Sequence, residues 1–190
     1  KAYLAEVFDS IQGEGLLVGS RQIFVRFCGC NLRCYYCDTQ WQKKPQFAVY
    51  HRPVVGGPAQ MLDNPVSADQ LKEILTGFTP RWISFTGGEP LLWHEFIMEL
   101  ANDLKAQGYK IMLETNGTLY EQMDKCCKLV DVVSMDYKLP SATGCNYREE
   151  HRRFLKAALK SKVFIKMVLT ARTSWAEVKE AVAVISSCSQ

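Results

Sequence analysis

The sequence predicts an α/β protein in which strands alternate with helices. Short runs of β-branched, aromatic and aliphatic residues, each bounded by turn-forming residues, are typical of strands, and amphipathic patterns typical of helices lie between them. Such alternation favours parallel strands joined by right-handed crossovers, so we expect an open sheet or a barrel. The predicted strands span residues 22–28, 82–87, 110–115, 129–135 and 163–169.

The helical segments carry recognisable start signals. Ser67 followed by Gln70, and Ser174 followed by Glu177, have the spacing of capping boxes, in which each side chain bonds to the backbone N–H of the other residue. An apolar stripe at helical spacing follows the second predicted strand and stops at a glycine, which commonly ends a helix. The predicted helices cover residues 67–75, 93–108, 147–160 and 174–186.

Length and composition predict one globular domain over residues 1–190. The chain is 47% hydrophobic and 23% charged, and it is long enough to bury a core. A proline- and glycine-rich segment over about residues 42–66 is expected to form an irregular insertion, and loops of that length are often functional. After the last predicted helix a sixth strand is due, so we expect a partial (β/α)6-type barrel that is truncated at the C-terminus of this chain.

Charge and hydropathy narrow the classes of partner. The formal net charge of +3 comes from Lys and Arg spread along the chain, which argues against a direct nucleic-acid partner. No apolar run approaches the roughly 18 residues of a membrane span, and the N-terminus lacks a signal-peptide pattern. We therefore expect a cytoplasmic protein. Because thiols stay reduced there, eight cysteines indicate a metal site more than disulfides.

Three of these cysteines, Cys30, Cys34 and Cys37, lie in a loop directly after the first predicted strand. A closed zinc site usually takes four ligands in two pairs, and the second pair is missing here. Three thiolates favour a 4Fe-4S cluster with one iron left open for a substrate or cofactor. Cys28 lies inside the apolar run, so we expect a buried core thiol there. The other cysteines have no predicted role beyond packing, namely Cys126, Cys127, Cys145 and Cys188.

The spacing of CNLRCYYC resembles the cluster loop, here residues 28–39, of the radical S-adenosylmethionine (SAM) superfamily, and a second motif supports the resemblance. TGGEP, residues 86–90, ends the next predicted strand and resembles the element with which that superfamily receives the methionine group of SAM. Its glycines allow close backbone approach, and its glutamate offers a carboxylate acceptor for an ammonium. The resemblance implies a radical SAM barrel fold and SAM contacts from Gly88 and Glu89.

Two further strand ends place polar residues where barrel enzymes build their sites. The resemblance implies that SAM is also contacted from SMDYK, residues 134–138, and our candidates are Ser134, Asp136 and Lys138. Glu114 and Asn116 in LETNG occupy an equivalent position, but they equally suit structural caps.

The first forty residues resemble one family within that superfamily. FDSIQGEG, residues 8–15, followed by FVRFCGCNLRCYYCDTQW, is similar to the 7-carboxy-7-deazaguanine synthases, and the similarity extends to about Pro140. IQGEG is a polar turn that suits the donor and acceptor edge of a pterin. The resemblance implies substrate contacts from the residues Ile11, Gln12, Gly13 and Glu14.

Three single residues take roles from the same resemblance. Arg26 lies among apolar residues, where a charge needs a partner. A core ion pair and a clamp for the substrate carboxylate both satisfy that need, and the resemblance implies the clamp. Thr86 would meet the substrate. Thr39 would bind Mg2+ through its hydroxyl, or else cap the loop.

The resemblance implies a lyase of 7-deazapurine biosynthesis, of the queuosine or archaeosine type. It would convert 6-carboxy-5,6,7,8-tetrahydropterin to 7-carboxy-7-deazaguanine with loss of ammonia, using a 4Fe-4S cluster, SAM and Mg2+. A flavodoxin or ferredoxin would supply electrons to a homodimer.

Two other functions fit part of the pattern. A radical SAM activase, which installs a glycyl radical on a partner protein, shares the cysteine spacing but leaves IQGEG, Arg26 and Thr39 without a purpose. A noncatalytic zinc module or electron carrier would need Cys28 as a fourth ligand and leaves TGGEP unexplained.

Overall fold

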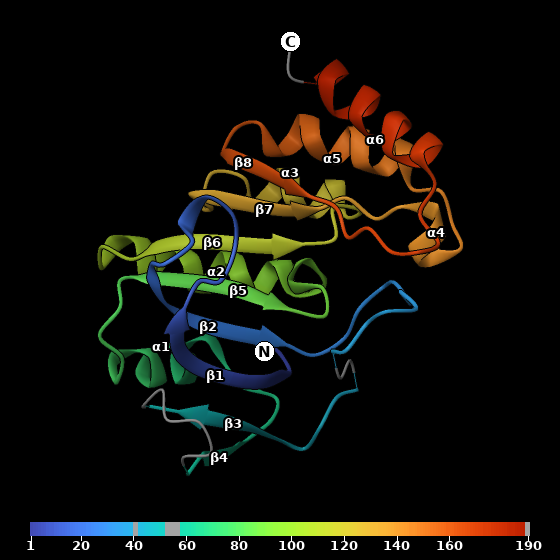
Figure 1. The fold of residues 1–190 in the computed structure, drawn as a ribbon. Coiled ribbons are helices and arrows are strands. Elements are labelled where there is room, and N and C mark those ends of the chain that lie inside the picture. Colours follow the sequence, from blue (N-terminus) through green and yellow to red (C-terminus); the bar gives the residue numbers. More distant parts are fainter. Residues whose placement is uncertain (40–41, 52–57, 189–190) are drawn as a thin grey trace.

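A computed structural model of the chain describes residues 1–39, 42–51 and 58–188. Its eight strands form one open, mixed sheet in the order β4-β3-β1-β2-β5-β6-β7-β8 (Figure 1). The strands are β1 (Leu4–Ile11), β2 (Arg21–Phe27), β3 (Gln46–Tyr50), β4 (Gln60–Asp63), β5 (Trp82–Gly87), β6 (Lys110–Thr115), β7 (Val132–Asp136) and β8 (Lys162–Lys166).

The five predicted strands are confirmed as β2, β5, β6, β7 and β8. They lie side by side in this order, and every neighbouring pair is parallel. This parallel block is the partial barrel expected from the sequence.

The prediction that residues 42–66 are irregular is wrong, because β3 and β4 lie within this segment and pair antiparallel. Phe47 and Val49 of β3 are buried and alternate with more exposed neighbours, which is a strand pattern of only five residues. The glycine pair and Pro53 lie outside the described residues. β1 was also not predicted, and it joins the parallel block by pairing antiparallel with β2.

The four predicted helices are confirmed, and each begins and ends within two residues of its predicted bounds. Both capping boxes are confirmed: Gln70 N donates to Ser67 Oγ over 3.2 Å and Glu177 N donates to Ser174 Oγ over 3.3 Å, and both reciprocal bonds are present. None of the described helices has the length and apolar character needed to cross a membrane. The helices are α1 (Ala68–Thr76), α2 (His94–Ala106), α3 (Tyr120–Cys126), α4 (Pro140–Thr143), α5 (Arg148–Ala158), α6 (Trp175–Cys188) and the short 3-10 turns η1 (Gly15–Leu17) and η2 (Pro90–Trp93).

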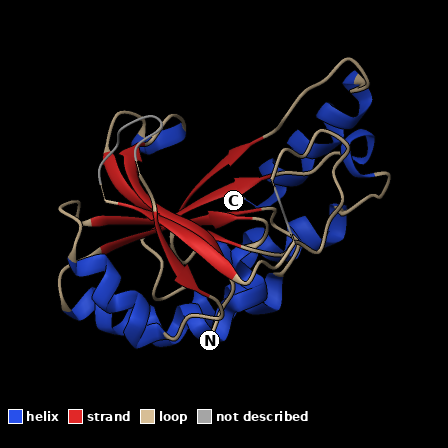
Figure 2. Cartoon of the chain, turned by 90° about the horizontal axis from the view of Figure 1, so that it is seen from below, coloured by secondary structure: helices blue, strands red, loops and turns tan. Residues whose placement is uncertain are grey.

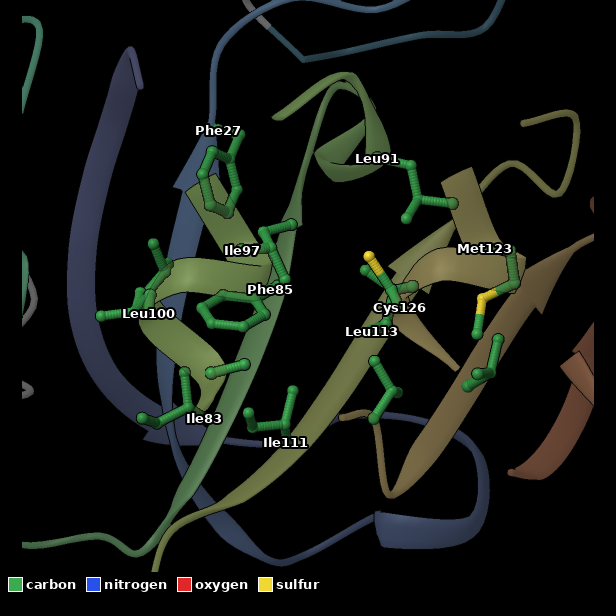
Figure 3. Packing of buried hydrophobic residues seen from close by; sticks show 14 of the residues in the cluster. Phe27, Ile83, Phe85, Leu91, Ile97, Leu100, Ile111, Leu113, Met123 and Cys126 are labelled. Atoms are coloured by element: carbon green, nitrogen blue, oxygen red, sulfur yellow. The ribbon is translucent and has the colours of Figure 1, made fainter. Parts of the chain in front are cut away.

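One face of the sheet forms the hydrophobic core against the helices (Figures 2 and 3). Successive side chains of a strand point to opposite faces, so alternate residues enter this core. Ile83 and Phe85 of β5, and Ile111 and Leu113 of β6, are fully buried and pack against α2 residues such as Ile97. The intervening positions of the same strands therefore face the opposite side of the sheet, and toward the carboxyl ends they are polar: Ser84, Thr86 and Glu114.

Candidate active site

A cavity of about 400 Å³ lies on the polar side of the sheet, next to the loop after β2. It is reached by the last residues of five strands, so it occupies the carboxyl end of the parallel block, where α/β proteins commonly bind ligands. Its walls are formed by Arg26, Cys30, Leu32, Arg33, Cys34, Tyr36, Cys37, Asp38, Thr39, Thr86, Gly87, Gly88, Glu114, Thr115, Asn116, Asp136, Lys138 and Lys166.

All three predicted cluster cysteines line this cavity. Cys37 N donates to Cys34 O over 3.0 Å, which folds the loop into a turn, and Asn116 Nδ2 lies 3.8 Å from Cys30 Sγ. Burial raises the pKa of Cys30 and of Cys34, and the Lys138 ammonium opposes this rise at Cys34. A bound cation or cluster would stabilise these thiolates.

The thiols do not converge on a single point. Across the residues that the structure describes, no three Cys, His, Asp or Glu side chains come together to hold one metal ion. In a 4Fe-4S cluster each cysteine binds a different iron, so its thiols surround the cluster from separate positions. Cys30, Cys34 and Cys37 all line one cavity, so the three thiols fit a cluster that would occupy it.

Cys28 is a buried core thiol, as predicted from its place in the apolar run. It is 0% exposed, it does not line the cavity, and burial raises its pKa. Of the cysteines without a predicted role, Cys145 is exposed, whereas three are buried: Cys126, Cys127 and Cys188.

The glycines of TGGEP bring the end of β5 against the cysteine loop. Gly88 N donates to Phe27 O over 3.1 Å and Glu89 N donates to Gly29 O over 2.8 Å. A Cβ atom added at Gly88 would lie only 2.0 Å from Gly29 O. Close backbone packing therefore requires glycine here, and it fixes the loop relative to β5.

Replacing Gly88 with alanine should destabilise the fold, because the added methyl group collides with backbone that cannot rotate away. We expect the free energy of unfolding to fall by about 3 kcal/mol, at the upper end of overpacking effects. Urea unfolding followed by circular dichroism measures this. Gly13→Ala is the matched control, since its added Cβ would meet nothing within 4 Å; equal losses in both variants would contradict the packing argument.

Glu89 is fully buried and joins the segment after β5 to the end of β6. Its carboxylate accepts from Asn116 N over 2.8 Å, from Leu91 N over 3.0 Å and from Thr115 Oγ1 over 2.8 Å. It does not line the cavity. Burial raises the pKa of Glu89 to about 7 despite these bonds. Its SAM contact stays a prediction, and its visible role is to place Asn116 beside Cys30.

The raised pKa of Glu89 makes stability depend on pH. Between its ordinary value of 4.5 and about 7, the folded carboxyl keeps a proton that the unfolded chain has lost, so stability falls as the pH rises. The fall amounts to about 3 kcal/mol at most. Glu89→Gln should flatten this part of the profile in urea unfolding at a series of pH values. The exposed Glu95→Gln should keep the wild-type slope, and an unchanged slope in Glu89→Gln would refute the assignment.

Arg26 lies at the cavity wall and is already ion-paired. Its Nε donates to Glu6 Oε1 over 2.7 Å, and its guanidinium carbon lies 5.8 Å from the centre of the Phe8 ring. The ion pair and the carboxylate clamp predicted for Arg26 are therefore compatible with each other. Glu6 takes the Nε donor, while the terminal nitrogens of the guanidinium carry further donors for a carboxylate in the cavity.

The predicted substrate turn, Ile11 to Glu14, contacts the cavity wall without lining the cavity itself. Gln12 is buried, and its Nε2 donates to Glu114 Oε1 over 2.9 Å. Glu14 forms an ion pair with Lys166. Ile11 and Gly13 are exposed.

Glu114 is the centre of a hydrogen-bond network at the cavity floor. It accepts from Gln12, from Ser84 Oγ over 3.0 Å and from Thr86 Oγ1 over 3.2 Å. The network joins the β1–β2 loop to β5 and β6, and it places Thr86, a predicted substrate residue, beside a carboxylate.

The end of β7 provides a buried ion pair and two buried oxygens that lack partners. Lys138 Nζ lies 2.7 Å from Asp136 Oδ2 and 3.2 Å from Tyr36 Oη. Burial disfavours the charge on Lys138, but the pair with Asp136 outweighs it and raises the pKa. Among the described residues, nothing hydrogen-bonds Ser134 Oγ or Asp136 Oδ1. Asp136 lines the cavity, so its Oδ1 can accept a hydrogen bond from a bound ligand, whereas Ser134 is buried beside it and does not line the cavity.

His151 of α5 contacts the backbone of the residues that follow β6 and β7. Its Nε2 lies 3.2 Å from Asn116 O, and burial lowers the pKa of His151 to about 4. The ring is therefore neutral at pH 7 and acts as a structural link.

Sequence reasoning missed several residues of the cavity, among them Tyr36 and Lys166. Tyr36 lies between two cluster cysteines, and its ring centre is 5.2 Å from Lys138 Nζ. Lys166 ends β8, but the predicted strand ran on to residue 169, so the sequence placed this lysine within a strand and gave no signal for it. Thr39 and Asp38 both line the cavity and place two oxygen-bearing side chains beside Cys37.

Comparison with known proteins identifies similar families. The family model described as the radical SAM superfamily matches residues 24–183. A curated 7-carboxy-7-deazaguanine synthase of Geobacter sulfurreducens is 38% identical over 192 residues, which cover 97% of this chain and 76% of that protein. One of Methanothermobacter thermautotrophicus is 43% identical over 151 residues, which cover 78% of this chain and 54% of that protein.

Solved structures share the fold. The crystal structure of QueE from Escherichia coli superposes with a TM-score of 0.56 at 20% identity, over 98% of this chain and 89% of that one. TYW1 with a lysine-pyruvate adduct superposes with a TM-score of 0.51 at 13% identity, over 88% of this chain and 72% of that one. At these identities the likeness concerns the fold alone.

Proposed function

This chain belongs to the radical SAM superfamily and, within it, to the 7-carboxy-7-deazaguanine synthases, and from this membership we propose the roles of its cavity residues. It is a radical SAM lyase of 7-deazapurine biosynthesis. The proposed reaction converts 6-carboxy-5,6,7,8-tetrahydropterin to 7-carboxy-7-deazaguanine and releases ammonia. One observation supports the proposal most strongly: three cluster cysteines, an arginine and Asp136, whose Oδ1 has no hydrogen-bond partner among the described residues, line the same cavity.

Cys30, Cys34 and Cys37 would hold the 4Fe-4S cluster, which together with SAM is the cofactor set of the superfamily. When bound, these groups supply the adenosyl radical that removes a hydrogen from the substrate. The residues of the chain would position these groups and the substrate and supply fixed charges around them. Asn116 donates toward Cys30 Sγ, and hydrogen bonds to a cluster sulfur tune its potential.

SAM would lie against the ends of β5 and β7. Ser134 Oγ and Asp136 Oδ1 are buried oxygens without partners in the described part of the chain, and they suit hydroxyl or ammonium donors of a ligand. Gly88 leaves room at the cavity wall, and Lys138 offers a fixed positive charge.

The pterin would lie between Arg26 and the predicted turn. The terminal nitrogens of Arg26 would bind the substrate carboxylate in the two-pronged geometry that suits guanidinium. Thr86 and the Ile11–Glu14 turn would contact the ring, with Gln12 held in place by Glu114. Mg2+ would bind at Thr39, and Asp38 beside it offers a carboxylate, the ligand class that hard cations prefer.

The remaining proposals follow the family resemblance. We expect a single radical SAM domain over residues 1–190, a cytoplasmic location, a homodimer, and electrons from a flavodoxin or ferredoxin.

The carboxylate clamp is testable by titration calorimetry on the anaerobically reconstituted protein with SAM. We expect saturable binding of 6-carboxytetrahydropterin and binding weaker by about tenfold or more for the tetrahydropterin that lacks the carboxylate, since the terminal nitrogens of Arg26 would lose their acceptor. Equal affinities for the two pterins would exclude a carboxylate clamp.

A further inference from the structure

The β1–β2 loop reaches across the open sheet. In Figure 1 this loop extends from the ends of β1 and β2 across β5 and β6, toward β7 and β8. Three strands separate β2 from β8 in the sheet, yet η1 of this loop contacts β8. The base of the loop is closed by two bonds of 2.8 Å, Gln12 N to Ser20 O and Gly19 N to Gln12 O. Its tip is therefore a defined structure that spans the cavity side of the sheet.

Two contacts fix the tip to β8. Gly15 has a φ of +70°, and a Cβ atom there would lie 2.2 Å from the Phe164 ring. Only glycine combines this backbone conformation with such a close approach. Lys166, two residues further along β8 and hence on the same face of the sheet, donates its ammonium to Glu14 Oε1.

Lys166 also belongs to the cavity. Its side chain is 27% exposed and lines the cavity wall, whereas Glu14 is 54% exposed. Gln12, on the other side of the tip, is anchored to Glu114 of β6. The turn thus has one anchor on β6 and another on β8, and the cavity lies beside both.

We propose that Lys166 is a positioning residue for pterin binding, because its ion pair with Glu14 holds the Gln12–Gly15 turn beside the cavity. This inference rests on the proposed function, in which the same turn contacts the substrate. Without Lys166 the turn keeps its anchor at Gln12 but loses the one at β8, so the substrate would meet a less ordered surface. Binding should weaken while the chemical step continues.

The test compares Lys166→Met with Lys162→Met in reconstituted holoenzyme. Lys162 is an exposed lysine at the other end of β8, so its replacement matches the chemistry of the change. We expect Lys166→Met to raise KM and the calorimetric Kd for 6-carboxytetrahydropterin about fivefold, the size expected for a partly exposed ion pair, with kcat within twofold. Lys166→Arg should restore most of the affinity.

A double-mutant cycle with Glu14→Gln adds a second readout. If Lys166 acts through Glu14, its replacement should cost little more in a Glu14→Gln background, and the exchanged pair Glu14→Lys with Lys166→Glu should recover part of the loss. A KM for Lys166→Met equal to that of Lys162→Met, or full additivity with Glu14→Gln, would overturn the inference. A wild-type protein that forms no deazapurine at all would instead refute the proposed function.

Discussion

Replacing Cys34 with alanine should abolish both the iron-sulfur cluster and product formation. Cys34 lies between Cys30 and Cys37 on the cavity wall, and removal of one of three thiolates leaves two irons without protein ligands. We expect iron and sulfide contents near zero after anaerobic reconstitution, loss of the brown colour, and no detectable turnover. Circular dichroism should remain that of the wild type, because Cys34 is outside the hydrophobic core.

Cys145→Ala is the matched control for this prediction. Cys145 is an exposed free cysteine that lies outside the cavity wall. Its replacement should leave the cluster content and the rate unchanged. If Cys34→Ala retained a full cluster, or if Cys145→Ala lost it, the assignment of the three ligands would be wrong.

The second large effect is expected at Arg26. Arg26→Ala should lower kcat/KM for 6-carboxytetrahydropterin by roughly 30- to 1000-fold, because truncating one partner of a desolvated, hydrogen-bonded charge pair costs about 2–4 kcal/mol. Arg26→Lys should recover only part of this loss, since lysine keeps the charge without the planar fork. Steady-state kinetics with product detection measures both variants.

Arg153→Ala provides the control for Arg26→Ala. Arg153 also pairs with a glutamate through Nε, at 3.2 Å, but it is 55% exposed on α5 and away from the cavity. We expect kcat/KM within twofold of the wild type there. SAM cleavage in the absence of pterin should persist in Arg26→Ala; its loss would mean that Arg26 supports the cofactor site and not the substrate.

The five parallel strands were predictable because each of them is a short apolar run with a clear boundary in the sequence. β5 and β6 match the predicted ranges residue for residue, since turn residues bound both apolar runs. β1 escaped prediction for a physical reason: a bulge between Leu4 and Glu6 shifts its register, so the two-residue alternation is interrupted. β3 was not predicted because it has only five residues and prolines flank it in the sequence.

The site was predictable where one motif carries the chemistry, and not where distant residues meet. The cysteine loop and TGGEP are short motifs, and the structure brings both to one cavity. The bond from Gln12 to Glu114 spans 102 positions and the pair of Glu14 with Lys166 spans 152, so no local pattern could reveal them. For Glu89 the sequence motif was recognised, but the complete burial of the side chain was not predicted.

The most direct test of the account is product formation by the purified chain. The anaerobically reconstituted protein would be incubated with dithionite, SAM, Mg2+ and 6-carboxy-5,6,7,8-tetrahydropterin, and the mixture analysed by mass spectrometry. We expect 7-carboxy-7-deazaguanine, formed over several turnovers and dependent on Cys34 and Arg26. Accumulation of 5'-deoxyadenosine without any deazapurine, in a protein with an intact cluster, would contradict the proposed substrate.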